Sequence, residues 1–146
     1  AVRFIEFMPL DAQGAWTDAQ VVSQAEILAT IDAVSPLEPM DAASRGSDPA
    51  ARWRYRDGRG DVGVIASVTE AFCDSCDRVR LTAEGMLRHC LFATRELDLR
   101  SLLRDGADDD AVEAAIRGEV GAKWAGHQIN QVHFIRPARS MSQIGG

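Results

Sequence analysis

Cysteine is scarce in this sequence, and all three cysteines lie in one segment, FCDSCDRVRLTAEGMLRHC (residues 72–90), with the spacing C-x2-C-x13-C. An odd number of clustered cysteines argues against the disulfide framework of a small secreted protein and for a metal site in a reducing compartment. Three thiolates are one ligand fewer than a closed structural zinc site or a fully cysteine-ligated 4Fe-4S cluster requires. The spacing therefore leaves open what would take the fourth position.

Other absences exclude further classes of protein. No apolar run approaches the length of a membrane span and no signal peptide is visible, so we expect a cytoplasmic protein without membrane contact. The formal net charge of -6 argues against a surface built to hold nucleic acid. The sequence lacks an initiator methionine and begins with a predicted strand, AVRFIEFMPL, from which we expect the C-terminal portion of a longer protein. With 146 residues, 46% of them hydrophobic, the chain can still bury a core.

The first quarter of the chain predicts a strand followed by a helix. The nearly continuous apolar run from Val2 to Met8 is typical of a buried strand in a parallel sheet. Ser23 and Glu26 form a capping-box pair, which predicts the start of a helix. The segment 35–51 is rich in proline and predicts a loop, so we expect one unit over residues 1–35 and a second over 36–146.

The middle of the chain predicts two hairpins. Residues 52–56 alternate in polarity, the sequence DGRG supplies a turn, and the apolar residues 62–66 return, which predicts the first hairpin. The cysteine segment predicts the second hairpin, with RVRLTA and MLRHCLF joined at Glu84 and Gly85. Such a hairpin would return Cys90 toward Cys73 and Cys76.

The last third predicts two helices. Asp98 is a plausible N-cap of the first helix, and the sequence GADDD would end it and cap the second. The second helix carries an apolar stripe that we expect to be core, namely Val112, Ala115, Ile116 and Val120. After residue 126 the periodicity fails, which predicts a polar tail without a hydrophobic face.

The spacing of the cysteines supports zinc and an iron-sulfur cluster about equally. A structural zinc site would need a histidine as its fourth ligand, and the candidates are His89, His127 and His133. His89 is the weaker candidate because it adjoins Cys90, and neighbours on a strand point to opposite faces.

Arg78 and Arg80 change this balance. They lie two residues apart, so on a strand both guanidinium groups would project to the same side, beside the metal ligands. Arginine is suited to binding phosphate, which favours an anionic ligand next to the metal. The alternative is that both are solvated arginines paired with nearby acidic residues. We favour the anion, which could itself supply the missing metal ligand.

Four stretches, RFIEFMPLD, FCDSCDRVRLTAEGMLRHCLF, DLRSLLR and MSQIGG, resemble the C-terminal half of the GTP 3′,8-cyclases of molybdenum cofactor biosynthesis, the MoaA family of radical S-adenosylmethionine enzymes. The resemblance implies an α/β fold: the C-terminal part of an incomplete (β/α)6 radical-SAM barrel, followed by an α+β domain that carries an auxiliary 4Fe-4S cluster. Residues 1–35 would be the last strand and helix of the barrel, and residues 36–146 the domain that binds this cluster and GTP.

The resemblance also implies an activity for the whole protein. In this family a first 4Fe-4S cluster, held by a CxxxCxxC motif in the N-terminal half, cleaves S-adenosylmethionine to a 5′-deoxyadenosyl radical. The radical abstracts hydrogen from C3′ of GTP, and the resulting carbon radical attacks C8 of guanine to give 3′,8-cyclo-7,8-dihydro-GTP. Cyclic pyranopterin monophosphate synthase acts on that product, and homodimers are common. Because CxxxCxxC is absent from these residues, we expect the chain alone to be inactive, and poorly soluble because of an unpaired sheet edge.

Site residues follow from the same resemblance. Cys73, Cys76 and Cys90 match the ligands of the second cluster, whose open iron binds the guanine base of GTP. The remaining matches are Arg3, Arg78 and Arg80 for contacts to GTP, Met8 for a contact to S-adenosylmethionine, and Gly145 and Gly146 for a tail that enters the active site and assists the chemistry. No role is assigned to Arg136, Arg139, His89, His127 or His133.

Three other classes explain less of the sequence. A structural zinc module with a Cys3His site would account for the cysteines but not for the paired arginines. A ubiquitin-like sulfur carrier would account for the Gly-Gly ending, but it explains no cysteine, and the helical residues 98–123 do not suit a small β-grasp domain. A peptide-modifying radical enzyme with an auxiliary cluster is disfavoured by the RVR pair and the Gly-Gly ending.

Overall fold

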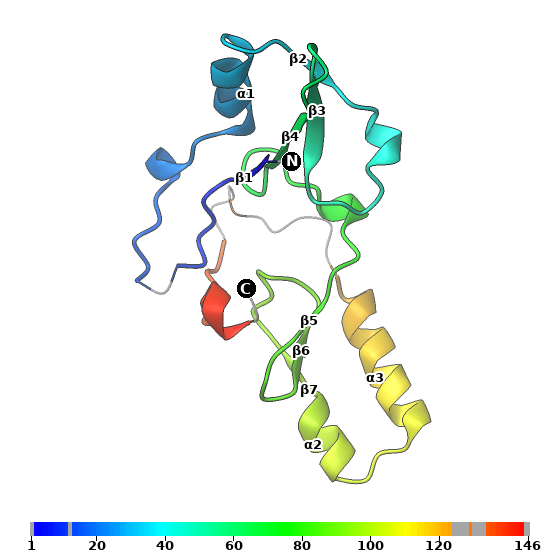
Figure 1. The fold of residues 1–146 in the computed structure, drawn as a ribbon. Coiled ribbons are helices and arrows are strands. Elements are labelled where there is room, and N and C mark those ends of the chain that lie inside the picture. The colour runs from blue at the N-terminus through cyan, green and yellow to red at the C-terminus, as the bar shows by residue number, and fades with distance from the viewer. Residues whose placement is uncertain (1, 12, 124–128, 130–133, 145–146) are drawn as a thin grey trace.

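The structure, a computed structural model, describes residues 2–11, 13–123, 129 and 134–144, and shows a mixed α/β fold (Figure 1). A four-stranded sheet and helix α1 form one end of the molecule, while a three-stranded sheet and helices α2 and α3 form the other. The C-terminal segment 134–144 returns to the region between these two ends (Figure 1). Segments from the start, middle and end of the chain therefore approach one another there.

The larger sheet has the strand order β1-β4-β3-β2. Strand β1 (Val2–Ile5) pairs in parallel with β4 (Asp61–Ile65), which pairs antiparallel with β3 (Ala51–Tyr55). Strand β2 (Leu37–Pro39) completes the sheet, antiparallel to β3. The hairpin predicted around DGRG is confirmed. Because β4 has a partner on each side, it supplies the centre of this core, with Val62 and Val64 at 0% and 1% exposure.

Two predictions for this region were wrong. Strand β1 is parallel as expected, but it ends at Ile5, and Val2 and Ile5 are 62% and 58% exposed. It is exposed because, among the described residues, it pairs only with β4 and forms an edge of the sheet. The predicted loop 35–51 contains strand β2 and a short 3₁₀ helix, Ala42–Ser44. The division of the chain at residue 36 stays a prediction, although one sheet includes strands from both sides of it.

Helix α1 (Gln24–Asp32) begins at the predicted capping box, where Ser23 N donates to Glu26 Oε2 at 2.9 Å. A short 3₁₀ helix, Asp18–Gln20, precedes it. The buried carboxylate of Glu6, at the end of β1, accepts a hydrogen bond from Gln24 N at 2.9 Å and another from Val68 N at 2.8 Å. Glu6 therefore ties β1 to the start of α1 and to the loop that follows β4.

The smaller sheet has the order β5-β6-β7, with all pairs antiparallel. Its strands are short: β5 (Arg80–Leu81), β6 (Met86–Arg88) and β7 (Leu97–Asp98). The predicted hairpin of the cysteine segment is confirmed as β5 and β6, with Gly85 in the turn at a φ of 85°. A side chain at Gly85 would also meet Arg100, because a Cβ placed there lies 2.7 Å from the Cβ of Arg100.

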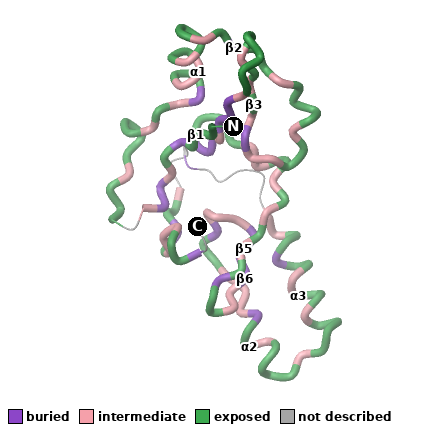
Figure 2. The backbone as a smooth tube through the Cα atoms, in the orientation of Figure 1, coloured by how far each residue is buried: buried purple, intermediate pink, exposed green. Residues whose placement is uncertain are grey.

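Both predicted C-terminal helices are present. Helix α2 (Leu99–Arg104) is capped by Asp98 and helix α3 (Asp109–Gly121) by Asp108. The apolar stripe of α3 was predicted to be core, but Val120 is 41% exposed, and the buried residue of this helix is Glu119. Figure 2 shows that most of α3 is exposed or only half-buried.

The C-terminal segment was predicted to be a polar tail, and this was wrong for the part that the structure describes. It contains a short 3₁₀ helix, Met141–Gln143, and Met141 N donates to Leu10 O at 3.0 Å. Ile144 is fully buried, at 0% exposure. One isolated apolar residue carries no periodic signal, which is why the pattern of the sequence did not predict this contact.

Candidate functional site

A cavity of about 190 Å³ collects residues from distant parts of the chain. All three cysteines line it, together with Arg78 and Arg80. The rest of its wall comes from β1 and the residues after it, β4 and the loop after it, the loop after β6, the residue that follows the C-cap of α3, and the C-terminal segment. It includes Ile5, Met8, Ile65, Ser67, Phe72, Leu91, Phe92, Lys123 and Met141. The predicted hairpin thus brings Cys90 to the same cavity as Cys73 and Cys76.

Local backbone geometry positions the first two cysteines. The short 3₁₀ helix Cys73–Ser75 ends in a turn in which Cys76 N donates to Cys73 O at 3.1 Å. Cys90 follows β6, and its Sγ accepts a hydrogen bond from Phe92 N at 3.4 Å. All three cysteines are half-buried thiols outside any disulfide. Three thiols that line one cavity are a donor set suited to a soft metal or to an iron-sulfur cluster.

Within residues 2–11, 13–123, 129 and 134–144, no group of three or more His, Cys, Asp or Glu side chains is arranged to hold a metal ion. His127 and His133, two of the predicted candidates for a fourth zinc ligand, lie outside the described residues. The third, His89, is buried, and its Nδ1 lies 2.5 Å from Glu119 Oε1. The described residues that line the cavity include no histidine.

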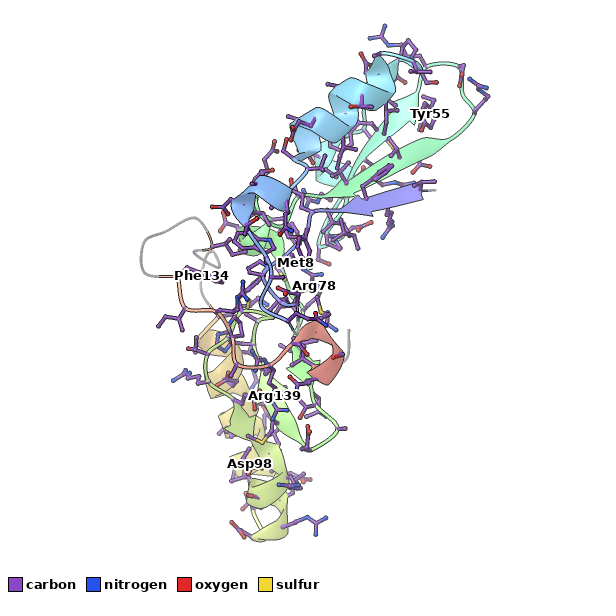
Figure 3. All side chains as sticks on the ribbon, turned by 90° about the vertical axis from the view of Figure 1, so that its left-hand side faces the viewer. Met8, Tyr55, Arg78, Asp98, Phe134 and Arg139 are labelled. Atoms are coloured by element: carbon purple, nitrogen blue, oxygen red, sulfur yellow. The ribbon has the colours of Figure 1, made fainter. Side chains whose placement is uncertain are left out.

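Arg78 and Arg80 share the cavity although only Arg80 belongs to strand β5. Arg78 Nε donates to Cys76 Sγ at 3.4 Å, and its guanidinium carbon lies 5.0 Å from the centre of the Phe72 ring. Figure 3 shows Arg78 and Met8, both lining residues, near each other where the two ends of the molecule meet. The cavity therefore combines thiols with guanidinium groups.

The pKa of the Cys76 thiol lies below its ordinary value. Burial is the largest single effect and raises this pKa, but the hydrogen bonds and charge of Arg78, together with the charge of Lys123, outweigh it. A thiol with a lowered pKa is more often a thiolate, which is the form that binds metal. The cationic wall of the cavity therefore favours the ligating form of Cys76.

Lys123 is the lining residue that the sequence patterns missed. Its Nζ donates to Arg78 O at 2.6 Å and to His89 O at 2.8 Å. It is the only lysine in the chain, among 16 lysine and arginine residues in total. That composition was a signal that could have singled it out.

The other predicted site residues lie elsewhere or outside the described residues. Arg3 does not line the cavity, and its guanidinium pairs with Asp48 at 3.2 Å. Gly145 and Gly146 lie outside the described residues. Arg139 pairs with Glu96 at 2.7 Å, while Arg136 lies 3.9 Å from Asp11. Among the described residues there is no helix long and apolar enough to cross a membrane.

Comparison with known proteins agrees with the resemblance. Residues 1–129 match the family described as Molybdenum Cofactor Synthesis C. A protein of Mycobacterium sp. (strain KMS) named GTP 3′,8-cyclase is 54% identical over 145 residues, which are 99% of this chain and 41% of the relative. GTP 3′,8-cyclase 2 of Mycobacterium bovis is 53% identical, and GTP 3′,8-cyclase of Mycolicibacterium smegmatis is 50% identical, each over 149 residues and with the same coverage.

The chain thus spans about two fifths of the length of these curated relatives. The family match and the relatives together confirm the family predicted from the four stretches of sequence. The chain belongs to the Molybdenum Cofactor Synthesis C family.

Proposed function

We propose that this chain is the part of a GTP 3′,8-cyclase that holds the second 4Fe-4S cluster and binds GTP, in molybdenum cofactor biosynthesis. The observation that carries the proposal is the single cavity lined by Cys73, Cys76, Cys90, Arg78 and Arg80. The relatives named GTP 3′,8-cyclase, which match nearly the whole chain, support the same activity.

The three thiolates would be the protein ligands of the cluster, with the hairpin β5-β6 holding Cys90 opposite the turn that carries Cys73 and Cys76. When bound, the cluster supplies an iron with an open coordination position for the guanine base. Arg78, Arg80 and Lys123 add positive charge to the same wall, in a chain whose formal net charge is -6. Positive groups in a cavity attract a nucleoside triphosphate and orient its phosphates.

The remaining roles extend this proposal. Met8 lines the cavity and would contact S-adenosylmethionine, while Arg3 would contact GTP, and Gly145 and Gly146 would enter the active site. Residues 1–35 would complete a partial (β/α)6 barrel, and residues 36–146 would form the domain of the second cluster. The proposal for the whole protein also includes a cytoplasmic location, a homodimer, and the use of the product by cyclic pyranopterin monophosphate synthase. It includes the CxxxCxxC motif as well, and because this chain lacks that motif, the chain alone would be inactive.

The test compares the complete gene product with a variant in which Cys73, Cys76 and Cys90 are all serine. Both proteins are reconstituted anaerobically with iron and sulfide, reduced, and examined by iron analysis and electron paramagnetic resonance with and without GTP. We expect the variant to lose the iron of one cluster and the part of the signal that shifts when GTP is added. Equal iron content and an equal GTP-dependent shift would contradict the proposal. One zinc per wild-type chain, lost in the variant, would identify a structural zinc site instead.

A further inference from the structure

Lys123, two residues after helix α3 ends, holds the two halves of the cysteine segment together. The Nζ of Lys123 donates to Arg78 O at 2.6 Å and to His89 O at 2.8 Å. Arg78 lies two residues after Cys76, and His89 immediately precedes Cys90. One ammonium group therefore joins the segment that carries Cys73 and Cys76 to the segment that carries Cys90.

Glu119 lies in the last turn of α3, which ends at Gly121, and acts on the same point of the hairpin as Lys123, which follows the helix. Its Oε1 lies 2.5 Å from Nδ1 of His89, and the two side chains are 8% and 4% exposed. The last turn of α3 and the residue that follows its C-cap thus contact residue 89 twice, through its side chain and through its carbonyl. Burying polar groups is costly unless they are paired, so this pairing fixes one geometry.

The identity of the cation at position 123 is unusual for this chain, in which every other basic residue except histidine is arginine. An ammonium group is compact and carries three donors in a tetrahedral arrangement, whereas a guanidinium group is a planar fork. Two of the ammonium donors serve the two carbonyls. The same side chain also lines the cavity, so its charge is placed beside the thiols.

We propose that Lys123 is a positioning residue that sets the distance between Cys90 and the pair Cys73 and Cys76. The inference rests on the proposed function, because it gives Lys123 a part in assembling the site for the second cluster. The three thiols line one cavity but come from two segments of the chain, so the relative position of those segments decides whether the thiols can serve one cluster.

The test uses the complete gene product with Lys123→Met, which keeps an unbranched side chain, one atom shorter, and removes its donors and charge. Arg117→Met is the matched control, because it removes one positive charge from helix α3, six residues before Lys123, at a side chain that is 77% exposed. The metal-free proteins are alkylated with iodoacetamide, and mass spectrometry gives the rate at each cysteine. Iron loading and the electron paramagnetic resonance signal of the reduced protein are then measured.

We expect Lys123→Met to raise the alkylation rate of Cys90 about tenfold, since two hydrogen bonds from a charged donor are lost, and to lose the iron of this cluster. Arg117→Met should match the wild type in both measurements. If Lys123→Met is alkylated at Cys90 at the same rate as the wild type and loads the same amount of iron, the proposal is overturned. If Lys123→Met does not fold, Lys123→Arg takes its place. It should fold and still alkylate several-fold faster at Cys90, and a wild-type rate there would equally overturn the proposal.

The two proposals fail in different ways. Alkylation is measured without metal, so faster reaction of Cys90 in Lys123→Met supports the positioning role even if the wild-type protein takes up no iron. In that case the proposed function fails alone. In the opposite case the wild-type protein loads iron and responds to GTP, and Lys123→Met behaves like the wild type. The positioning role of Lys123 then fails alone.

Discussion

Glu6 has its carboxylate buried where strand β1, helix α1 and the loop after β4 meet. It accepts hydrogen bonds from Gln24 N, Val68 N and Thr69 N at 2.9, 2.8 and 2.8 Å, and from Thr69 Oγ1 at 2.6 Å. Four donors converge on one anion, and the loop that they hold continues from Ile65 and Ser67, which line the cavity. Glu6 therefore links the stability of the larger sheet to the shape of the site.

We predict that Glu6→Gln lowers the free energy of unfolding by about 3 kcal/mol, because an amide nitrogen replaces one acceptor and faces buried donors. Denaturant unfolding followed by circular dichroism measures this loss. The matched control is Glu38→Gln on β2, where the side chain is exposed, and it should change stability by less than about 0.5 kcal/mol. Equal effects of the two substitutions would show that the buried network does not depend on the charge of Glu6.

Glu96 makes a second charged junction, with Arg88 on β6 and with Arg139 in the C-terminal segment. Burial is the largest single effect and would raise its pKa, but the hydrogen bonds and charges of the two arginines outweigh it and hold the pKa below its ordinary value. A carboxyl whose pKa is lower in the folded state stabilises the fold at neutral pH. That contribution is lost as the pH falls below the unfolded value of about 4.3 and through the folded pKa.

We predict that the advantage in unfolding temperature of the wild type over Glu96→Gln is constant near neutral pH and shrinks below about pH 4.3. Thermal unfolding of both proteins across a pH series measures it. Glu113→Gln is the control, because Glu113 pairs with Arg117 at an exposed position, with the two side chains 61% and 77% exposed. An advantage in unfolding temperature that stays the same at low pH would show that Glu96 stabilises the fold through packing and not through its charge.

What the sequence could predict at the residue scale depends on how local each interaction is. Cys73, Cys76, Arg78 and Arg80 lie within eight residues, so one turn and one strand are enough to bring them together. The contact of Lys123 with Arg78 spans 45 residues, and that of Arg3 with Asp48 also spans 45. Neither has a periodic or spacing signal, because each depends on how separate elements pack.

Turns and caps are the elements that the sequence predicted best. The capping box at Ser23 and the N-caps at Asp98 and Asp108 were correct because each is a hydrogen bond within about one helical turn. The burial of β1 was not predicted correctly, because it depends on whether a second neighbour covers the strand. A continuous apolar run indicates a strand in a parallel sheet, but it does not say which of its sides is paired within a given chain.

The turn of the cysteine hairpin offers a test at the scale of one element. Gly85 has a φ of 85°, and an added Cβ would lie 2.7 Å from the Cβ of Arg100. Gly58, in the turn between β3 and β4, has a φ of 77° but no atom within 4 Å of an added Cβ. The two glycines therefore share the backbone strain that alanine would suffer and differ in the steric clash.

We predict that Gly58→Ala lowers the free energy of unfolding by about 1 kcal/mol, the cost of the left-handed conformation for a residue with a side chain. Gly85→Ala should cost about 1 to 2 kcal/mol more, because the hairpin must also move away from α2. Denaturant unfolding compares the two variants. Equal costs would mean that Arg100 and the turn separate freely, and that the cysteine hairpin is less firmly placed than its packing indicates.

At the scale of the whole molecule, the outer edge of the larger sheet is the least complete feature. Strand β1 pairs only with β4 among the described residues, and it carries exposed apolar side chains, with Val2 62%, Phe4 38% and Ile5 58% exposed. Unpaired strand edges and exposed apolar patches both promote association between chains. The same end of the molecule lies beside the cavity, because Ile5 also lines it.

We predict that the 146-residue chain expressed alone self-associates through this edge, and that Val2→Lys raises the monomer fraction, since a lysine on an edge strand opposes pairing with another chain. Val34→Lys is the matched control, because Val34 is 85% exposed but lies in the loop after α1, away from the edge. Sedimentation velocity over a range of concentrations measures the association of all three proteins. A monomeric wild-type chain would show that the edge is tolerated in water. An equal effect of both lysines would instead assign any gain to net charge, because only pairing at the β1 edge predicts a difference between the two positions.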